Sequence, residues 1–229
     1  MYLSRLILNP LCAQVRAELA RPYEMHRTLL RAFPQSVVHK ERDDDSGAGV
    51  LFRVDEQPRD NRIVVLVQSQ VAPTWEYLNN ERDARGHTYL LCPPETKAFD
   101  PLIRLAVGQM LAFRLRANPT KRLGKRAGDD HHKRVGLLKE EEQLKWLQRK
   151  ADAGGFRILR AMVSRDEHIE DKTESPRGNE KAQRHLEFVS VQFDGVLQVV
   201  SADDLGKTIV RGIGSGKGFG FGLLSLAPV

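Results

Sequence analysis

A tyrosine, a histidine and two arginines lie close together in the segment PYEMHRTLLRAFP. Tyr23 and His26 are three residues apart, so on a helix their side chains would be neighbours. Arg27 and Arg31 follow on nearly the same arc. A phenol, an imidazole and guanidinium groups around a phosphate can transfer protons and stabilise developing charge. The spacing indicates a general acid/base site for phosphodiester chemistry, although the same spacing is also common on ordinary exposed helix faces.

The helix that must position these side chains is predicted to run from Tyr23 to Phe33. Pro22 suits its first position, because its fixed φ and missing N–H cost nothing there. Free backbone N–H groups and the helix dipole favour an anion at this end. The opposite arc is apolar and should pack inward, through Met25, Leu29, Ala32 and Phe33.

A second stretch suited to anions is the glycine run Gly212 to Gly222, which reads GIGSGKGFGFG. Without Cβ atoms, its backbone N–H groups can approach a phosphate closely. The run lacks the Walker A and dinucleotide-binding patterns, so a phosphate or a nucleic-acid backbone is the predicted ligand. A flexible hairpin is the alternative, but the apolar LLSL that follows predicts a strand that pins the run. The residues predicted to contact this phosphate or nucleic-acid backbone are Gly214, Gly216, Lys217, Gly218 and Gly220.

Basic residues gather in the middle of the chain. The stretch Met110 to Ala117 alternates as a strand, with two arginines on one face and apolar residues on the other. A solvated charged face is one interpretation, but the bases continue past this strand, which favours a surface that follows phosphates. The predicted contacts are Arg114, Arg116, Lys121, Arg122, Lys125, Arg126, Lys133 and Arg134.

Composition narrows the class of protein. The chain has 229 residues, 41% of them hydrophobic, and a net charge of +6, which fits an anionic partner. Its two cysteines form no disulfide framework, and no signal peptide or bilayer-length apolar run is visible. A cytoplasmic protein away from membranes is expected. His131 and His132 have no third ligand nearby, so neither a metal nor a cofactor is expected, and phosphodiester chemistry would be metal-independent.

The order of predicted elements indicates the fold class. The first half has strands at Tyr2–Leu8, Val50–Val54, Ile63–Val67 and Thr88–Cys92, with helices after the first and third. This β-α-β-β-α-β order is ferredoxin-like. The second half repeats it, with an Asp194–Gly195 hairpin turn between two strands and a helix capped by Ser201. A loop is predicted over 169–185. The expected fold is α+β, two tandem ferredoxin-like domains at 1–92 and 108–229, joined by a linker at 93–107.

Four blocks together resemble a known family. MYLSRLILNP, PYEMHRTLLRAFP, FRLRANPTKR and GIGSGKGFGFGLLSLAP occur in this order from the first residue to the last. The chain is similar to the CasE-type CRISPR RNA-processing endoribonucleases of subtype I-E systems, the e branch of the Cas-six superfamily.

The resemblance implies tandem ferredoxin-like domains and metal-independent cleavage of the CRISPR repeat transcript at the base of a stem-loop. The upstream 2′-hydroxyl would attack the scissile phosphate, leaving 2′,3′-cyclic phosphate and 5′-hydroxyl ends. The family's catalytic histidine falls on His26 and its tyrosine on Tyr23, with the assignment of acid and base open. Arg27 or Arg31 would neutralise the phosphorane. The glycine run would hold the RNA backbone, so Gly218→Val should damage RNA binding more than the chemical step.

The family also implies partners: CRISPR repeat stem-loop RNA, as precursor and as retained product, and the other protein subunits of Cascade. A second hypothesis is a non-catalytic RNA-hairpin-binding subunit of a CRISPR ribonucleoprotein that uses the same surfaces. A third is a ferredoxin-like metabolite-binding regulator, which should lack salt-dependent affinity for RNA.

Overall fold

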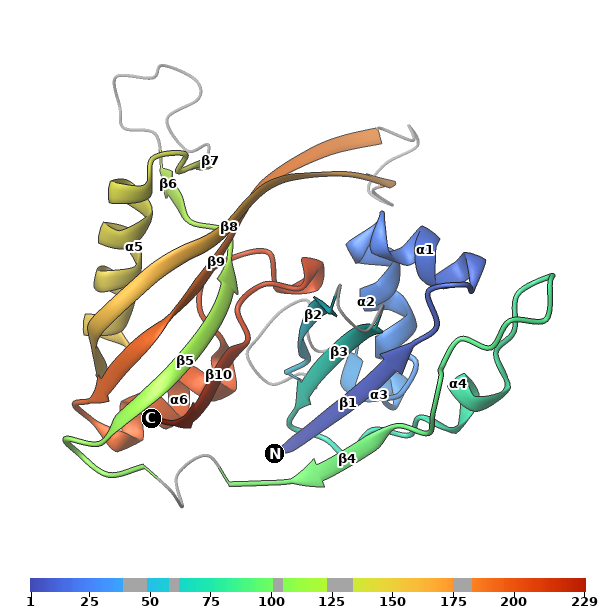
Figure 1. Cartoon of the computed structure of the whole chain (residues 1–229), viewed down its shortest axis with the longest axis horizontal. Coiled ribbons are helices and arrows are strands. Elements are labelled where there is room, and N and C mark those ends of the chain that lie inside the picture. Colours follow the sequence, from blue (N-terminus) through green and yellow to red (C-terminus); the bar gives the residue numbers. More distant parts are fainter. Residues whose placement is uncertain (39–48, 58–61, 101–104, 123–133, 175–182) are drawn as a thin grey trace. The chain divides into compact units, whose positions relative to one another are not determined.

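The chain is an α+β protein with antiparallel sheets, as the sequence predicts. The computed structural model describes residues 1–38, 49–57, 62–100, 105–122, 134–174 and 183–229. For residues 164–174 and 183–187 it describes the backbone alone. Two compact units are present, coloured along the chain in Figure 1. The first holds Met1–Pro101, Asp171–Arg184 and Lys217–Gly220, and the second holds Leu102–Glu170, His185–Gly216 and Phe221–Val229.

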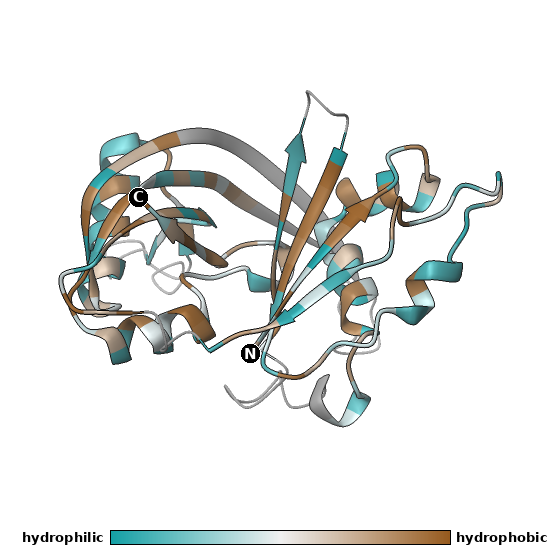
Figure 2. Ribbon diagram, turned by 60° about the horizontal axis from the view of Figure 1, so that its bottom comes forward, coloured by the Kyte–Doolittle hydropathy of each residue, from teal (hydrophilic) through white to brown (hydrophobic). Residues whose placement is uncertain are grey.

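The first unit is built on a four-stranded sheet in the order β2-β3-β1-β4. Alternate residues of the two central strands form the core: Leu6 pairs with Val65, and both are fully buried. Hydrophobic residues concentrate on these strands in Figure 2. The strands are β1 (Tyr2–Leu8), β2 (Leu51–Gln57), β3 (Arg62–Ser69) and β4 (Glu95–Ala98).

Helices cover one face of this sheet. Met25 and Leu29 pack into the same hydrophobic core as Leu6 and Val65, so the predicted apolar arc is confirmed. The helices are α1 (Ala13–Leu19), α2 (Pro22–Leu30), α3 (Gln35–Val38) and α4 (Glu76–Asn80).

The second unit has a four-stranded sheet in the order β10-β5-β9-β8 and a separate two-stranded ribbon of β6 and β7. The strand predicted at Met110–Ala117 is confirmed: Leu111, Phe113 and Leu115 are buried in its core. The strands are β5 (Met110–Ala117), β6 (Thr120–Arg122), β7 (Arg134–Gly136), β8 (Phe156–Glu174), β9 (Gln183–Val199) and β10 (Leu224–Pro228).

Two helices pack on this sheet, α5 (Glu140–Ala153) and α6 (Ala202–Arg211). The predicted cap of α6 is confirmed, since the Ser201 side chain accepts a hydrogen bond from the Asp204 N–H. A short 3₁₀ helix, η3 (Lys217–Phe219), lies within the glycine run. Over the described residues, none of the helices combines the length and apolar character needed to cross a bilayer.

The strand predicted at Thr88–Cys92 is wrong. Thr88 and Leu90 form only isolated bridges, with Arg82 and Leu8. The position beside β1 belongs instead to β4, whose four side chains are all exposed, so it carries no hydrophobic alternation for the sequence to reveal. β4 lies inside the stretch 93–107 that was expected to be a linker. The division at 1–92, 93–107 and 108–229 stays a prediction.

The hairpin turn predicted at Asp194–Gly195 is also wrong, because β9 runs straight through it. A Cβ on Gly195 would collide with the carbonyl oxygen of Arg160 on β8, so this glycine permits close approach of a neighbouring strand. Part of the loop predicted over 169–185 is strand as well, since β8 continues to Glu174 and β9 begins at Gln183. Residues 175–182 of that loop lie outside the described residues.

Candidate active site

The helix α2 presents Tyr23 and His26 side by side, as predicted. It begins at Pro22, and its buried residues Met25, Thr28 and Leu29 fix its rotation on the core. The Tyr23 and His26 rings then lie 6.2 Å apart between centroids, tilted by 44°. Both side chains lie in the first two turns, near the positive end of the helix dipole.

The glycine run meets this pair within the first unit. Phe219 of η3 stacks on Tyr23, with ring centroids 5.6 Å apart and an interplanar angle of 29°. A Cβ built on Gly218 would lie 3.2 Å from His26 Cδ2 and 3.5 Å from Nε2. A side chain at 218 would therefore press on the imidazole, and glycine lets the bare backbone cross it.

The imidazole of His26 is enclosed from a second side by Phe52 of β2. The two rings are nearly parallel, 5.9 Å apart between centroids and 12° apart in orientation. Nδ1 is buried and has no hydrogen-bond partner among the described residues. Burial disfavours the charged imidazolium and lowers the pKa of His26 to about 4. The ring is neutral at physiological pH and has a nitrogen available to accept a proton.

The alternation of glycines has two causes. Five of the six have positive φ, a conformation that side chains disfavour: Gly212, Gly214, Gly216, Gly220 and Gly222. The sixth, Gly218, is needed because its backbone passes close to His26.

The run is divided between the units, because Lys217–Gly220 belongs to the first and its other residues to the second. Gly218 lies beside His26, and Lys217 belongs to the same unit as the Tyr23/His26 pair, while Gly214 and Gly216 do not.

The two helix arginines predicted to face a phosphate have protein partners. Arg27 pairs with Glu24 one turn earlier, at 3.0 Å. Arg31 is the C-cap of α2, and its guanidinium pairs with Glu81 at 2.9 Å and lies 4.6 Å from the Tyr77 ring centroid. The structure gives Arg31 these contacts rather than one with Tyr23 or His26, so its catalytic role stays a prediction.

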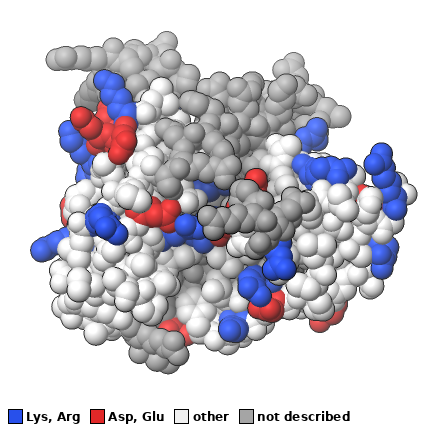
Figure 3. Space-filling model, in the orientation of Figure 1, with Lys and Arg blue, Asp and Glu red and all other residues white. Residues whose placement is uncertain are grey.

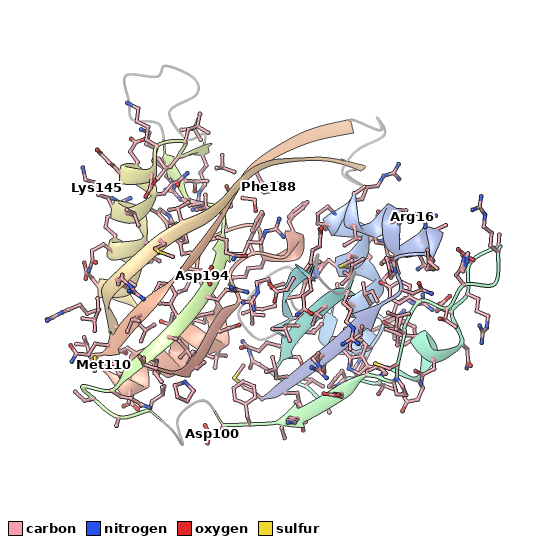
Figure 4. The ribbon with its side chains drawn as sticks, in the orientation of Figure 1. Arg16, Asp100, Met110, Lys145, Phe188 and Asp194 are labelled. Atoms are coloured by element: carbon pink, nitrogen blue, oxygen red, sulfur yellow. The ribbon has the colours of Figure 1, made fainter. Side chains whose placement is uncertain are left out.

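The arginines of β5 also have protein partners. Arg114 donates to Asp194 of β9 at 2.6 Å, and the strand that carries Asp194 lies beside β5 in Figure 4. Arg116 donates to Ser190 at 2.8 Å and lies 5.8 Å from the Phe221 ring centroid. Figure 3 shows some basic side chains of the visible face beside acidic ones and others, such as those along its right edge, apart from them. Binding of RNA by Arg114 and Arg116 would compete with these contacts.

The remaining basic residues of the predicted surface divide into two groups. Lys121 pairs with Glu142 of α5 at 2.8 Å, while Arg122 and Arg134 are opposite each other in the β6–β7 ribbon. Lys125, Arg126 and Lys133 lie outside the described residues.

Sequence reasoning missed the two phenylalanines that pack against Tyr23 and His26. Phe219 alternates with glycine in the run, which is unusual for a flexible loop, but that pattern does not identify its partner. Phe52 lies in an ordinary apolar strand and gives no signal. Within the described ranges, no group of three or more His, Cys, Asp or Glu side chains is placed to hold a metal ion.

Known proteins are similar to the whole chain. A family model described as CRISPR associated protein matches residues 1–228. CRISPR-associated endoribonuclease Cse3 of Thermus thermophilus is 36% identical over 234 residues, and the Cascade subunit CasE of Escherichia coli is 31% identical over 236, each with 100% of both chains covered. A solved structure of CRISPR endoribonuclease Cse3 bound to 19 nt RNA is similar with a TM-score of 0.79 and 37% identity, over 100% of both chains.

Proposed function

Because the chain belongs to the family of CRISPR-associated proteins that includes Cse3 and CasE, we propose that it is an endoribonuclease that cleaves CRISPR repeat stem-loops in precursor CRISPR RNA. One observation carries the proposal: a neutral, buried His26 lies beside Tyr23 in the first two turns of a helix, with the backbone of Gly218 close to its ring. The name endoribonuclease given to Cse3 and the RNA held in its structure support the substrate class.

The chemistry that suits this pair needs no metal ion. The 2′-oxygen upstream of the scissile phosphate forms a bond to phosphorus, and the bond from phosphorus to the 5′-oxygen breaks. One proton leaves the 2′-hydroxyl and one reaches the 5′-oxygen, giving a 2′,3′-cyclic phosphate and a 5′-hydroxyl. We assign His26 as the proton acceptor, since its lowered pKa keeps it neutral, and Tyr23 as the donor. The phosphate charge would raise the pKa of His26 as the RNA arrives.

Binding of the RNA is proposed to use the glycine run and the basic residues of the second unit. The main-chain N–H groups and Lys217 would hold the backbone near His26. Arg27 and Arg31 would neutralise the phosphorane after exchanging their carboxylate partners for phosphate oxygens. An A-form stem exposes phosphates and 2′-hydroxyls more readily than base edges, so these contacts would read shape.

Each unit is proposed to be a ferredoxin-like domain. The first unit has strands in the order β2-β3-β1-β4 and the second in the order β10-β5-β9-β8. Numbered within each unit, both orders are 4-1-3-2 in one direction, which is the arrangement of a split β-α-β fold. β1 pairs with β3 and β5 with β9 in antiparallel fashion, which supports this assignment.

After cleavage, the protein is proposed to keep its product and to act in the cytoplasm as a subunit of Cascade. The name of its relative CasE, a Cascade subunit, supports this role. Tight retention of the product would make turnover slow while leaving single-turnover cleavage fast.

The test is cleavage of a labelled repeat stem-loop in EDTA by the intact protein and by two variants. His26→Ala and Tyr23→Phe should each slow single-turnover cleavage by about 100-fold or more, the usual effect of removing a proton-transfer group. His87→Ala is the matched control: this histidine of the same unit bonds Asp83 at 3.2 Å and should be dispensable for cleavage.

Full-length RNA recovered from a tight complex with the intact protein would contradict an enzyme and favour the non-catalytic hairpin-binding subunit. Undiminished cleavage by His26→Ala would contradict the assigned site.

A further inference from the structure

The second unit contains a pocket of about 280 Å³ that the catalytic pair does not use. The β6–β7 ribbon, helix α5 and the start of the glycine run form it. Its lining includes Arg122, Arg134, Trp146, Lys150, Gly214 and Ser215.

The charge of this pocket is one-sided. Among the described lining residues, three side chains are cationic and exposed, Arg122, Arg134 and Lys150, and none is a carboxylate. Arg122 and Arg134 are direct cross-strand partners, and like charges placed opposite each other destabilise a ribbon. The other face of the ribbon is different, because Lys121 is neutralised there by Glu142. An anion between the two arginines would offset their repulsion.

The burial of Trp146 in the pocket wall favours an anion over a stacked base as the ligand. Trp146 is only 4% exposed. The Phe193 ring stacks on it with centroids 6.3 Å apart, and Lys150 Nζ lies 5.8 Å from its ring centroid. Because the indole is almost fully buried, it offers little surface on which a base could stack.

The glycine run contributes bare backbone to the pocket. Gly214 has φ +89°, and a Cβ there would lie 3.1 Å from Trp146 Cζ2. Ser215 is held beside Asn118 by an antiparallel bridge. Any side chain at 214 would be strained and would press on the indole, so this part of the run keeps its backbone at the pocket wall.

We propose that this pocket binds a backbone phosphate of the RNA, separate from the scissile phosphate, with Lys150 as a contact residue alongside Arg122 and Arg134. The proposal rests on the proposed function for the identity of the ligand. The site adds affinity that does not depend on base sequence, and it takes no part in proton transfer.

The test compares two lysines of the same helix. Lys150 lines the pocket, whereas Lys145 is exposed and projects from α5 in Figure 4. The probe is a repeat stem-loop RNA from the CRISPR array of the source genome, made non-cleavable by a 2′-deoxy nucleotide, titrated at several salt concentrations. Lys150→Ala should weaken binding by about fivefold or more and lower the slope of log Kd against log salt by about one. Lys150→Arg should bind within about twofold of the intact protein, and Lys145→Ala should bind like it.

Equal losses for Lys150→Ala and Lys145→Ala, or no loss for either, would overturn the pocket. So would a Lys150→Ala variant whose single-turnover cleavage at saturating protein is slowed while its affinity is unchanged. These binding measurements do not depend on cleavage. An intact protein that binds but never cuts would refute the endonuclease while leaving the phosphate site standing.

Discussion

The imidazole of His26 stacks on the Phe52 ring and lies close to the backbone of Gly218, with its Nδ1 buried. Two consequences follow at the scale of single residues. The ring stays neutral because its charged form is poorly solvated. Position 218 requires glycine because a side chain there would press on the imidazole. Its backbone conformation does not require glycine, since Gly218 is the one glycine of the run without positive φ.

The first prediction concerns Gly218→Ala. A methyl group there would lie 3.2 Å from His26 Cδ2, so the ring must shift and proton transfer should slow by about tenfold or more. Affinity for the RNA should change less. This prediction differs from the one drawn from the sequence, that Gly218→Val damages RNA binding more than the chemical step. The measurement is single-turnover cleavage beside RNA affinity.

Gly108→Ala is the control for this prediction. Its φ is +86° and a Cβ there meets open space, so it tests backbone strain without a contact to His26. It should lose stability and keep its cleavage rate. A Gly218→Ala variant that cleaves normally but binds poorly would restore the original expectation.

A second prediction is that His26 makes stability depend on pH. The unfolded histidine binds a proton near pH 6.5 and the folded one near pH 4, so the unfolded state gains protons first as pH falls. This contribution to the free energy of unfolding is complete above about pH 6.5 and is lost towards pH 4. Between pH 7 and pH 4.5, intact protein should lose about 2 kcal/mol more stability than His26→Gln. Denaturant unfolding at both pH values measures it.

Equal losses for the two proteins, or an NMR titration of His26 with a midpoint near pH 6.5, would contradict the enclosed, neutral imidazole.

At the scale of elements, a buried carboxylate holds α2 in place. Glu18 of α1 is 5% exposed and accepts hydrogen bonds from Gln14, Thr28 and Tyr89, the last at 2.6 Å. Burial and the neighbouring carboxylate raise the pKa of Tyr89, which keeps its phenol protonated and donating. These bonds join α1, α2 and the segment before β4, and so fix the helix that carries Tyr23 and His26.

The third prediction tests this network with Tyr89→Phe. Removing the phenol O–H leaves a buried carboxylate with one donor fewer, which should cost about 1–3 kcal/mol in free energy of unfolding. Tyr2→Phe is the matched control on β1 and should change stability by about 0.5 kcal/mol or less. Equal effects in denaturant unfolding would show that Glu18 does not depend on the Tyr89 donor.

Elements with strong local patterns could be predicted from the sequence. The alternation of β5, the apolar arc of α2 and the Ser201 cap are properties of a few neighbouring residues. β4 could not be predicted, because its side chains are all exposed. Asp194–Gly195 resembles a turn locally, yet the close approach of Arg160 from β8 is what requires the glycine.

At the scale of the whole molecule, the candidate site joins the two ends of the chain. Phe219 and Gly218 contact Tyr23 and His26, and no local pattern encodes such distant contacts. The sequence could supply the site's residue types, through PYEMH and the glycine run, and the family resemblance, which is confirmed over residues 1–228. The neutral state of His26 and the pocket beside Trp146 required the fold.

We propose that this protein cuts RNA by attack of the RNA's own 2′-hydroxyl, with protons carried by Tyr23 and His26. The most direct measurement is single-turnover cleavage in EDTA of two repeat stem-loops that differ only by a 2′-deoxy nucleotide upstream of the scissile phosphate. We expect rapid cleavage of the all-ribose RNA to a 2′,3′-cyclic phosphate, and no cleavage of the deoxy RNA although it binds equally well. Cleavage of the deoxy RNA, or cleavage of the all-ribose RNA only after a divalent metal is added, would contradict this proposal.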